Sequence, residues 1–200
     1  MNTKHFPNTG YLYYYISIGI LWGLAEFFIG TLLKDIVPGN IAGSVLIGFS
    51  LFFLSVSYNL EKSKIMLIIP LLFSILIKLF GTLLIGKQIL HPFFINPLLS
   101  LILTTILFSA TQNLPFAKYK KYGHPITGTL LYGLTIAALS SLLFPLLNYL
   151  SGFPMCYKTG TSIPLSVWYL HISAITGAIS YYTGIILSEK LVKRYLNHNL

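Results

Sequence analysis

The chain has 200 residues, of which 55% are hydrophobic and only 8% are charged. Soluble domains carry roughly a quarter charged residues, so this composition excludes an ordinary soluble protein and indicates a chain embedded in lipid. The net charge of +9 does not indicate a nucleic-acid partner, because the positive residues stand singly or in small groups between long apolar runs. The single cysteine, Cys156, excludes a disulfide within the chain.

Six apolar segments are long enough to cross a bilayer core of ~30 Å, which takes about 20 helical residues. In chain order they are 11–32, 41–58, 65–85, 93–111, 126–150 and 165–188. An open sheet would leave backbone groups unpaired in hydrocarbon, and the alternating pattern of a barrel is absent from the sequence. We therefore predict an all-α fold: one membrane domain, residues 1–200, forming a polytopic bundle of six transmembrane helices.

The distribution of Lys and Arg predicts the orientation of the bundle. If the helices alternate in direction, nine of these residues share the side of both termini: Lys4, Lys62, Lys64, Lys118, Lys120, Lys121, Lys190, Lys193 and Arg194. The opposite side holds three: Lys34, Lys87 and Lys158. The positive-inside rule then predicts that both termini are cytoplasmic and that the protein lies in the cell (inner) membrane. The first segment, which Glu26 interrupts, has no cleavage site and is predicted to be a permanent span.

Two charged residues lie inside predicted spans, Glu26 in the first and Lys78 in the third. A charge at the bilayer centre costs about 2.5–3.5 kcal/mol on insertion scales, so both are expected to face the protein interior and seek partners. At ~1.5 Å per helical residue they reach nearly the same height, in the outer half, which permits an ion pair. The pair either ties two helices together or contacts a ligand, and these interpretations are not exclusive.

Other polar residues are predicted to lie at the same outer level, and they come from three further helices: Asn96, Asn148, Trp168 and His171. With Glu26 and Lys78 they suggest a polar cavity that opens to the extracytoplasmic side. Taken singly, each has a plainer explanation, because an asparagine caps helix ends and a lone histidine often serves in packing. The inner half offers mostly Ser and Thr, which can bond to their own helix carbonyls.

Small residues form a second pattern, Gly19-x-x-x-Gly23, on one face of the first predicted helix. Such a face allows another helix to approach closely, either within the bundle or from a partner membrane protein. No catalytic motif, nucleotide-binding motif or zinc motif occurs, so no catalytic residue, metal or cofactor is expected. The spacing of His91, Cys156 and His171 does not specify a metal site.

The sequence resembles the substrate-binding S components of energy-coupling factor transporters, and uncharacterised membrane proteins similar to them. The resemblance is carried by Leu21-Trp-Gly-Leu-Ala-Glu-Phe-Phe-Ile-Gly30, by Pro38-Gly39, by Gly43 to Gly48 and by Lys78. It implies capture of a vitamin or related micronutrient from outside the cell, with a transmembrane coupling protein and two ATPases as partners. In that family small residues spaced four apart on the first helix meet the coupling protein, and Gly19 and Gly23 match the spacing.

Three classes of function remain open at this point. The first is a membrane subunit that binds a small polar or zwitterionic solute through Glu26, Lys78, Asn96 and His171, with Asn148 at the same level and Trp168 packing against the solute. The second is a membrane-embedded enzyme that acts on a lipid or small molecule through Glu26 or His171. The third is an accessory subunit without a ligand, in which the Glu26–Lys78 pair only sets the helix register.

Overall fold

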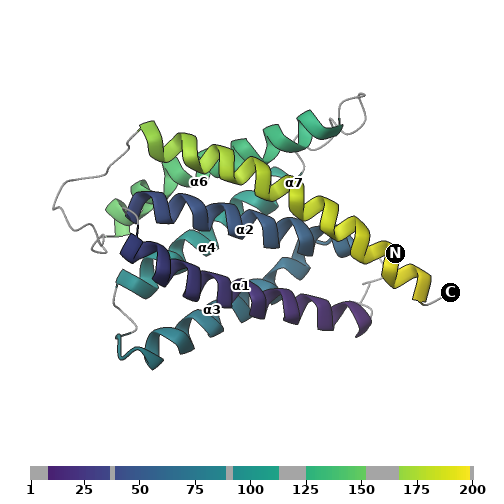
Figure 1. Cartoon of the computed structure of the whole chain (residues 1–200), viewed down its shortest axis with the longest axis horizontal. Coiled ribbons are helices and arrows are strands. Elements are labelled where there is room, and N and C mark those ends of the chain that lie inside the picture. Colours follow the sequence, from purple (N-terminus) through teal and green to yellow (C-terminus); the bar gives the residue numbers. More distant parts are fainter. Residues whose placement is uncertain (1–8, 37–38, 89–91, 113–124, 152–166, 199–200) are drawn as a thin grey trace.

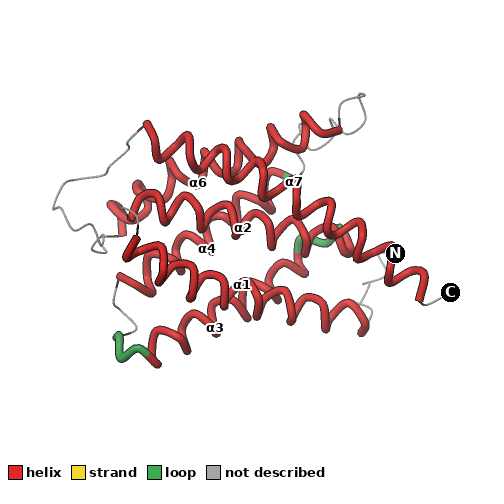
Figure 2. The backbone as a smooth tube through the Cα atoms, viewed as in Figure 1, coloured by secondary structure: helices red, strands yellow, loops and turns green. Residues whose placement is uncertain are grey.

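The computed structural model describes residues 9–36, 39–88, 92–112, 125–151 and 167–198, and within these ranges the regular structure is helical (Figure 2). The elements are α1 (Thr9–Ile36), α2 (Gly39–Glu61), a 3-10 turn η1 (Ile65–Leu67), α3 (Ile68–Leu84), α4 (Pro92–Thr111), α6 (Pro125–Ser151) and α7 (Val167–His198). Six of these helices are long and apolar enough to cross a membrane, over Tyr11–Leu33, Ile41–Glu61, Ile65–Leu84, Phe94–Thr111, Ile126–Leu147 and Tyr169–Lys193. The predicted all-α fold with six spans is therefore confirmed.

Several helix ends follow from local chemistry. Proline begins both α4 and α6, where its missing N–H removes no helical hydrogen bond. After α3, Gly86 adopts a φ of 70° and its N–H bonds to the carbonyl of Leu83 at 2.9 Å, which closes the helix. After α2, Lys62 takes the left-handed φ of 55° and its N–H bonds to the carbonyl of Tyr58 at 2.7 Å. The last helix was predicted to end at residue 188, and it continues to His198.

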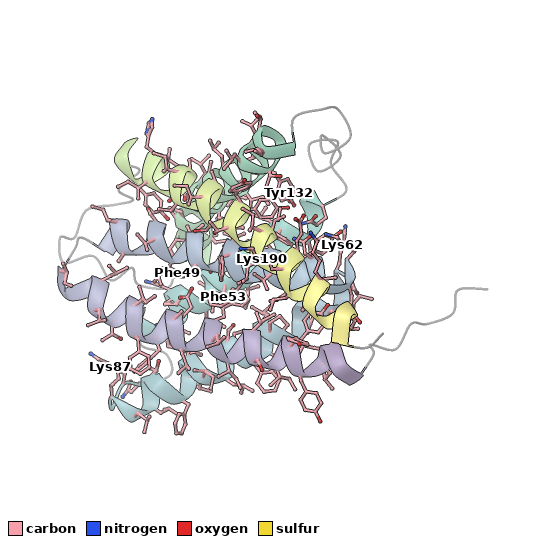
Figure 3. The ribbon with its side chains drawn as sticks, turned by 45° about the vertical axis from the view of Figure 1, so that its right-hand side comes forward. Phe49, Phe53, Lys62, Lys87, Tyr132 and Lys190 are labelled. Carbon is pink, nitrogen blue, oxygen red and sulfur yellow. The ribbon has the colours of Figure 1, made fainter. Side chains whose placement is uncertain are left out.

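The start of α1 and the end of α7 lie at the same end of the bundle (Figure 1). We call this the terminal end, and the opposite one the far end. Lys62 lies toward the terminal end and Lys87 at the far end (Figure 3). This arrangement agrees with an even number of spans, while the side of the membrane that the terminal end faces stays a prediction.

The helices pack as two closely joined groups. In one, α1 lies against α3; in the other, α2 and α6 both lie against α7, and α4 packs against α6, α2 and α3. Glycines set the close approaches in the second group: a Cβ at Gly133 of α6 would lie 2.7 Å from the Cβ of Tyr181, and one at Gly184 of α7 would lie 2.7 Å from the carbonyl oxygen of Phe52. Large apolar side chains on the outer faces, including Leu76 and Phe80 of α3, are exposed as expected for contact with lipid.

Candidate functional site

The structure brings Glu26 and Lys78 together between α1 and α3. Each side chain is only 2% exposed, and the ammonium nitrogen of Lys78 donates a hydrogen bond to the main-chain carbonyl oxygen of Glu26 at 2.9 Å. The two opposite charges also attract each other. The Lys78 nitrogen lies 6.0 Å from the centre of the Phe27 ring, so the charge is enclosed by α1.

A third helix joins this contact through Ser50 of α2, a residue that the sequence analysis did not single out. Its hydroxyl donates to the Glu26 carboxylate oxygen Oε1 at 3.2 Å. Gly30 of α1 lies beside this contact, where a Cβ would stand at an ordinary van der Waals distance of 3.5 Å from the Lys78 nitrogen. Glu26 thus connects α1 to α3 through its main chain and to α2 through its side chain, roughly 15 Å from the far end of α1.

The Gly19-x-x-x-Gly23 face lies against α3 within the chain. A Cβ at Gly19 would stand 2.8 Å from the Cα of Pro70, and one at Gly23 would stand 2.9 Å from the carbonyl oxygen of Ser74. Real Cβ atoms do not approach that closely, so both positions need glycine for the helices to touch. A partner helix would have to displace α3 to reach this face.

A second polar region lies on α4, α6 and α7, where buried oxygen atoms have no hydrogen-bond partner among the described residues. These atoms are Asn96 Oδ1, Thr104 Oγ1, Ser140 Oγ, Ser141 Oγ and Ser173 Oγ. Most described hydroxyls bond to a carbonyl of their own helix, as the neighbouring Thr105 does to Leu101 at 2.8 Å. We call the five residues the unpaired polar group. They lie roughly 5–20 Å from the far ends of their helices.

Helix register places two members of this group side by side. The α6–α7 approach pairs Ala137 with Gly177, so one helical turn toward the far end Ser141 is expected to face Ser173. Both serines are 0% exposed. Pro145 adds to the local polarity, because it has no N–H to donate to the Ser141 carbonyl one turn before it.

The remaining predicted site residues fall in different places. Asn96 belongs to the unpaired polar group, whereas His171 is exposed near the far end of α7. Asn148 lies in α6 and Trp168 in α7, but their side chains are outside the described residues, as are His91 and Cys156. Within the described part of the chain no group of three His, Cys, Asp or Glu side chains is arranged to hold a metal ion.

The sequence could not identify the unpaired polar group. Serine and threonine are common in membrane helices and usually bond within their own helix, so only the packing shows which of them lack a partner. Comparisons with protein-family models, with curated proteins and with solved structures give no match. The fold and the two polar regions define the chain as a multi-pass α-helical membrane protein with hydrophilic groups inside its bundle.

Proposed function

We propose that this chain is the membrane-embedded solute-binding subunit of an uptake system for a small polar micronutrient. The observation that carries the proposal is the unpaired polar group on α4, α6 and α7. A buried polar atom left without a partner costs about 1–3 kcal/mol, and a solute with hydrogen-bond donors would remove that cost. Few, well-placed polar groups within a mostly apolar surrounding are typical of small-molecule sites.

The chemistry of these helices indicates the class of solute. Residues 92–111, 125–151 and 167–188 contain no Asp, Glu, Lys or Arg. The Asn96 amide oxygen only accepts hydrogen bonds, while the serine and threonine hydroxyls both donate and accept. The solute part bound here is therefore uncharged and rich in hydroxyl or amide groups. A zwitterionic solute would place its charged part toward Glu26 and Lys78 on the neighbouring helices.

Energy for uptake would come from partner proteins. The sequence has no nucleotide-binding motif, and the resemblance of residues 19–80 to S components supports a coupling protein and ATPases as partners. An enzyme is less well supported. Glu26 is the one carboxylate away from the ends of the described membrane spans, because Glu61 and Glu189 lie at or near the terminal ends of theirs. Both Glu26 and Lys78 are enclosed in contacts between helices.

A second candidate is an accessory subunit without a ligand. The bonds from Lys78 and Ser50 to Glu26 favour it, because they give the buried charges partners within the chain. In that case the Glu26–Lys78 pair fixes the register of α1 on α3, and the resemblance to S components is one of architecture.

Thermal unfolding of the solubilised protein tests the choice. We expect one class of water-soluble vitamin, at high excess over its dissociation constant, to raise the midpoint by on the order of 5 °C. The double substitution Ser141→Ala with Ser173→Ala should abolish this shift, whereas Thr135→Ala, at an exposed α6 hydroxyl, should leave it intact. No shift across a broad vitamin panel would favour the accessory subunit. If the vitamin-induced shift is lost only in Lys78→Met, the solute binds between α1 and α3 and not at the unpaired polar group.

A further inference from the structure

Four aromatic residues lie on the terminal-end side of the unpaired polar group. Phe108 of α4 is 0% exposed, and three tyrosine rings from three other helices surround it. The ring centres of Tyr58, Tyr132 and Tyr181 lie 5.9, 6.2 and 6.0 Å from that of Phe108, each steeply inclined to it. Tyr132 and Tyr181 also contact each other at 4.9 Å. We call these four residues the aromatic cluster.

The cluster is fastened to the end of α4 by hydrogen bonds. The Tyr132 hydroxyl donates to the Phe108 carbonyl at 3.2 Å and lies 2.8 Å from the Thr111 hydroxyl. Because α4 ends at Thr111, its last carbonyls lack the N–H groups that a longer helix would supply. A phenol from α6 satisfies one of them inside the membrane, where an unpaired carbonyl is costly.

The aromatic residues and the unpaired hydroxyls occupy the same rows of these helices. On α4, Thr104 precedes Phe108 by one turn; on α6 and α7, Ser140 and Ser173 stand two turns from Tyr132 and Tyr181. Residues four and eight apart form the inclined ridges along which helices pack. In each helix the hydroxyl lies nearer the far end and the aromatic ring nearer the terminal end.

We propose that the aromatic cluster is a gate that closes the terminal end of the proposed solute site. Tyr132 lies toward the end that carries Lys62 and away from Lys87 (Figure 3). On the terminal side, the side-chain amide nitrogen of Gln112, one turn beyond Phe108 at the end of α4, is buried and has no partner among the described residues. Unpaired polar atoms thus lie on both sides of the aromatic cluster, as expected for one pathway interrupted by a closure.

Opening this gate requires two linked changes. The Phe108 ring must leave the space between the three tyrosines, and the Tyr132 hydroxyl must release the α4 carbonyl. The close α6–α7 contacts at Gly133 and Gly177 lie at the level of the cluster and about one turn from it toward the far end. These contacts hold the terminal half of the α6–α7 interface together. The terminal half of this interface therefore stays closed while the far-end half is the part able to separate around Ser141 and Ser173.

This inference rests on the proposed function for the identity of the site, but its test needs no solute. In a Cys156→Ser background, Ser140→Cys places a thiol on the far-end side of the cluster. The full-length protein in liposomes is exposed to a membrane-impermeant thiol reagent on one face at a time. We expect labelling from the far-end face and little from the terminal face. Phe108→Ala should raise labelling from the terminal face by at least about tenfold.

The controls separate the gate from general loosening. Phe80→Ala removes the same ring from the lipid-facing side of α3, where Phe80 is 61% exposed, and should leave both rates unchanged. Tyr132→Phe keeps the ring and removes the hydroxyl, and should raise terminal-face labelling by a smaller factor. The gate is refuted if a folded Phe108→Ala protein labels from the terminal face at the wild-type rate, or if wild type already labels equally from both faces. Either result would be independent of whether any vitamin binds.

Discussion

The ammonium group of Lys78 on α3 reaches across to α1 and donates a hydrogen bond to the main-chain carbonyl of Glu26 at 2.9 Å. This contact joins two helices that have opposite charges at the same depth and almost no exposure to the surroundings. A lysine with such a hydrogen-bond partner serves mainly to join the two helices, because a buried charge without partners would be driven out of the membrane interior.

Removing the lysine should therefore destabilise the protein more than removing both charges. Lys78→Ala leaves the buried Glu26 carboxylate with the Ser50 hydroxyl but without the opposite charge of Lys78, and removing one charge of a buried pair costs about 3–5 kcal/mol. The double substitution Glu26→Gln with Lys78→Met should recover most of that loss. Thermal unfolding in detergent measures the coupling, and Lys87→Ala, at an exposed lysine just past α3, is the matched control. If the effects of Glu26→Gln and Lys78→Met, measured singly, simply add up to that of the double substitution, the coupling is contradicted.

The glycines of α1 should differ in their tolerance of a methyl group. A Cβ at Gly23 would stand 2.6 Å from the Ile77 Cβ, whereas one at Gly30 would find its nearest neighbour, in Leu46, at 3.4 Å. Gly23→Ala is expected to destabilise by about 1–3 kcal/mol through overpacking, and Gly30→Ala to be neutral or slightly stabilising. Gly30→Leu should be harmful, since its longer side chain competes with Lys78 for space. Unfolding midpoints of the three variants provide the comparison.

The fold was predictable because lipid imposes strict demands on length and hydrogen bonding. Each predicted span corresponds to a helix, and the depth argument placed Glu26 and Lys78 close enough to meet. Helix ends were less predictable, since α7 continues past its apolar segment to His198. Spacing alone did not show whether Gly19 and Gly23 face α3 or a partner, because either helix gives the same pattern.

The candidate site was predicted only in part, for a physical reason. Asn96 was chosen for its depth, and its amide oxygen is indeed buried without a partner among the described residues. His171 was chosen by the same argument and is exposed. Depth follows from counting residues, but the direction in which a side chain points depends on helix rotation. Rotation of a helix that is apolar all round is set by packing, which the sequence pattern does not reveal.

Replacing the unpaired serines should stabilise the protein when no solute is present. Ser141→Ala and Ser173→Ala each remove a buried hydroxyl that has no partner, which is worth about 1–3 kcal/mol. Ser188→Ala is the matched control, because that hydroxyl of α7 bonds to the Ile185 carbonyl at 2.7 Å and its loss should not raise stability. Unfolding midpoints without added ligand decide the matter. Lower midpoints for both variants would show that these serines have partners in the membrane.

The orientation of the bundle also makes a direct prediction. The start of α1 and the end of α7 lie at one end of the bundle (Figure 1), and the excess of Lys and Arg predicted for that side indicates that this end is cytoplasmic. A fluorescent reporter that matures only in the cytoplasm should therefore be fluorescent when fused to either terminus. A periplasmic phosphatase reporter should be active after Lys87 and inactive at the termini. Activity in the reverse pattern would place the aromatic cluster on the extracytoplasmic side.

The hydroxyl of Tyr132 should stabilise the protein through the end of α4. Tyr132→Phe keeps the ring against Phe108 but leaves the Phe108 carbonyl with the Thr111 hydroxyl as its side-chain donor. We expect a loss of about 1–2 kcal/mol, typical of a buried hydrogen bond whose acceptor stays in place. Tyr13→Phe is a suitable control, because Tyr13 is 74% exposed. Hydrogen exchange should become faster in the last turn of α4 and stay unchanged in α1. Unchanged exchange in α4 would mean that the phenol does not fasten this helix end, and the link between α6 and α4 within the gate would be lost.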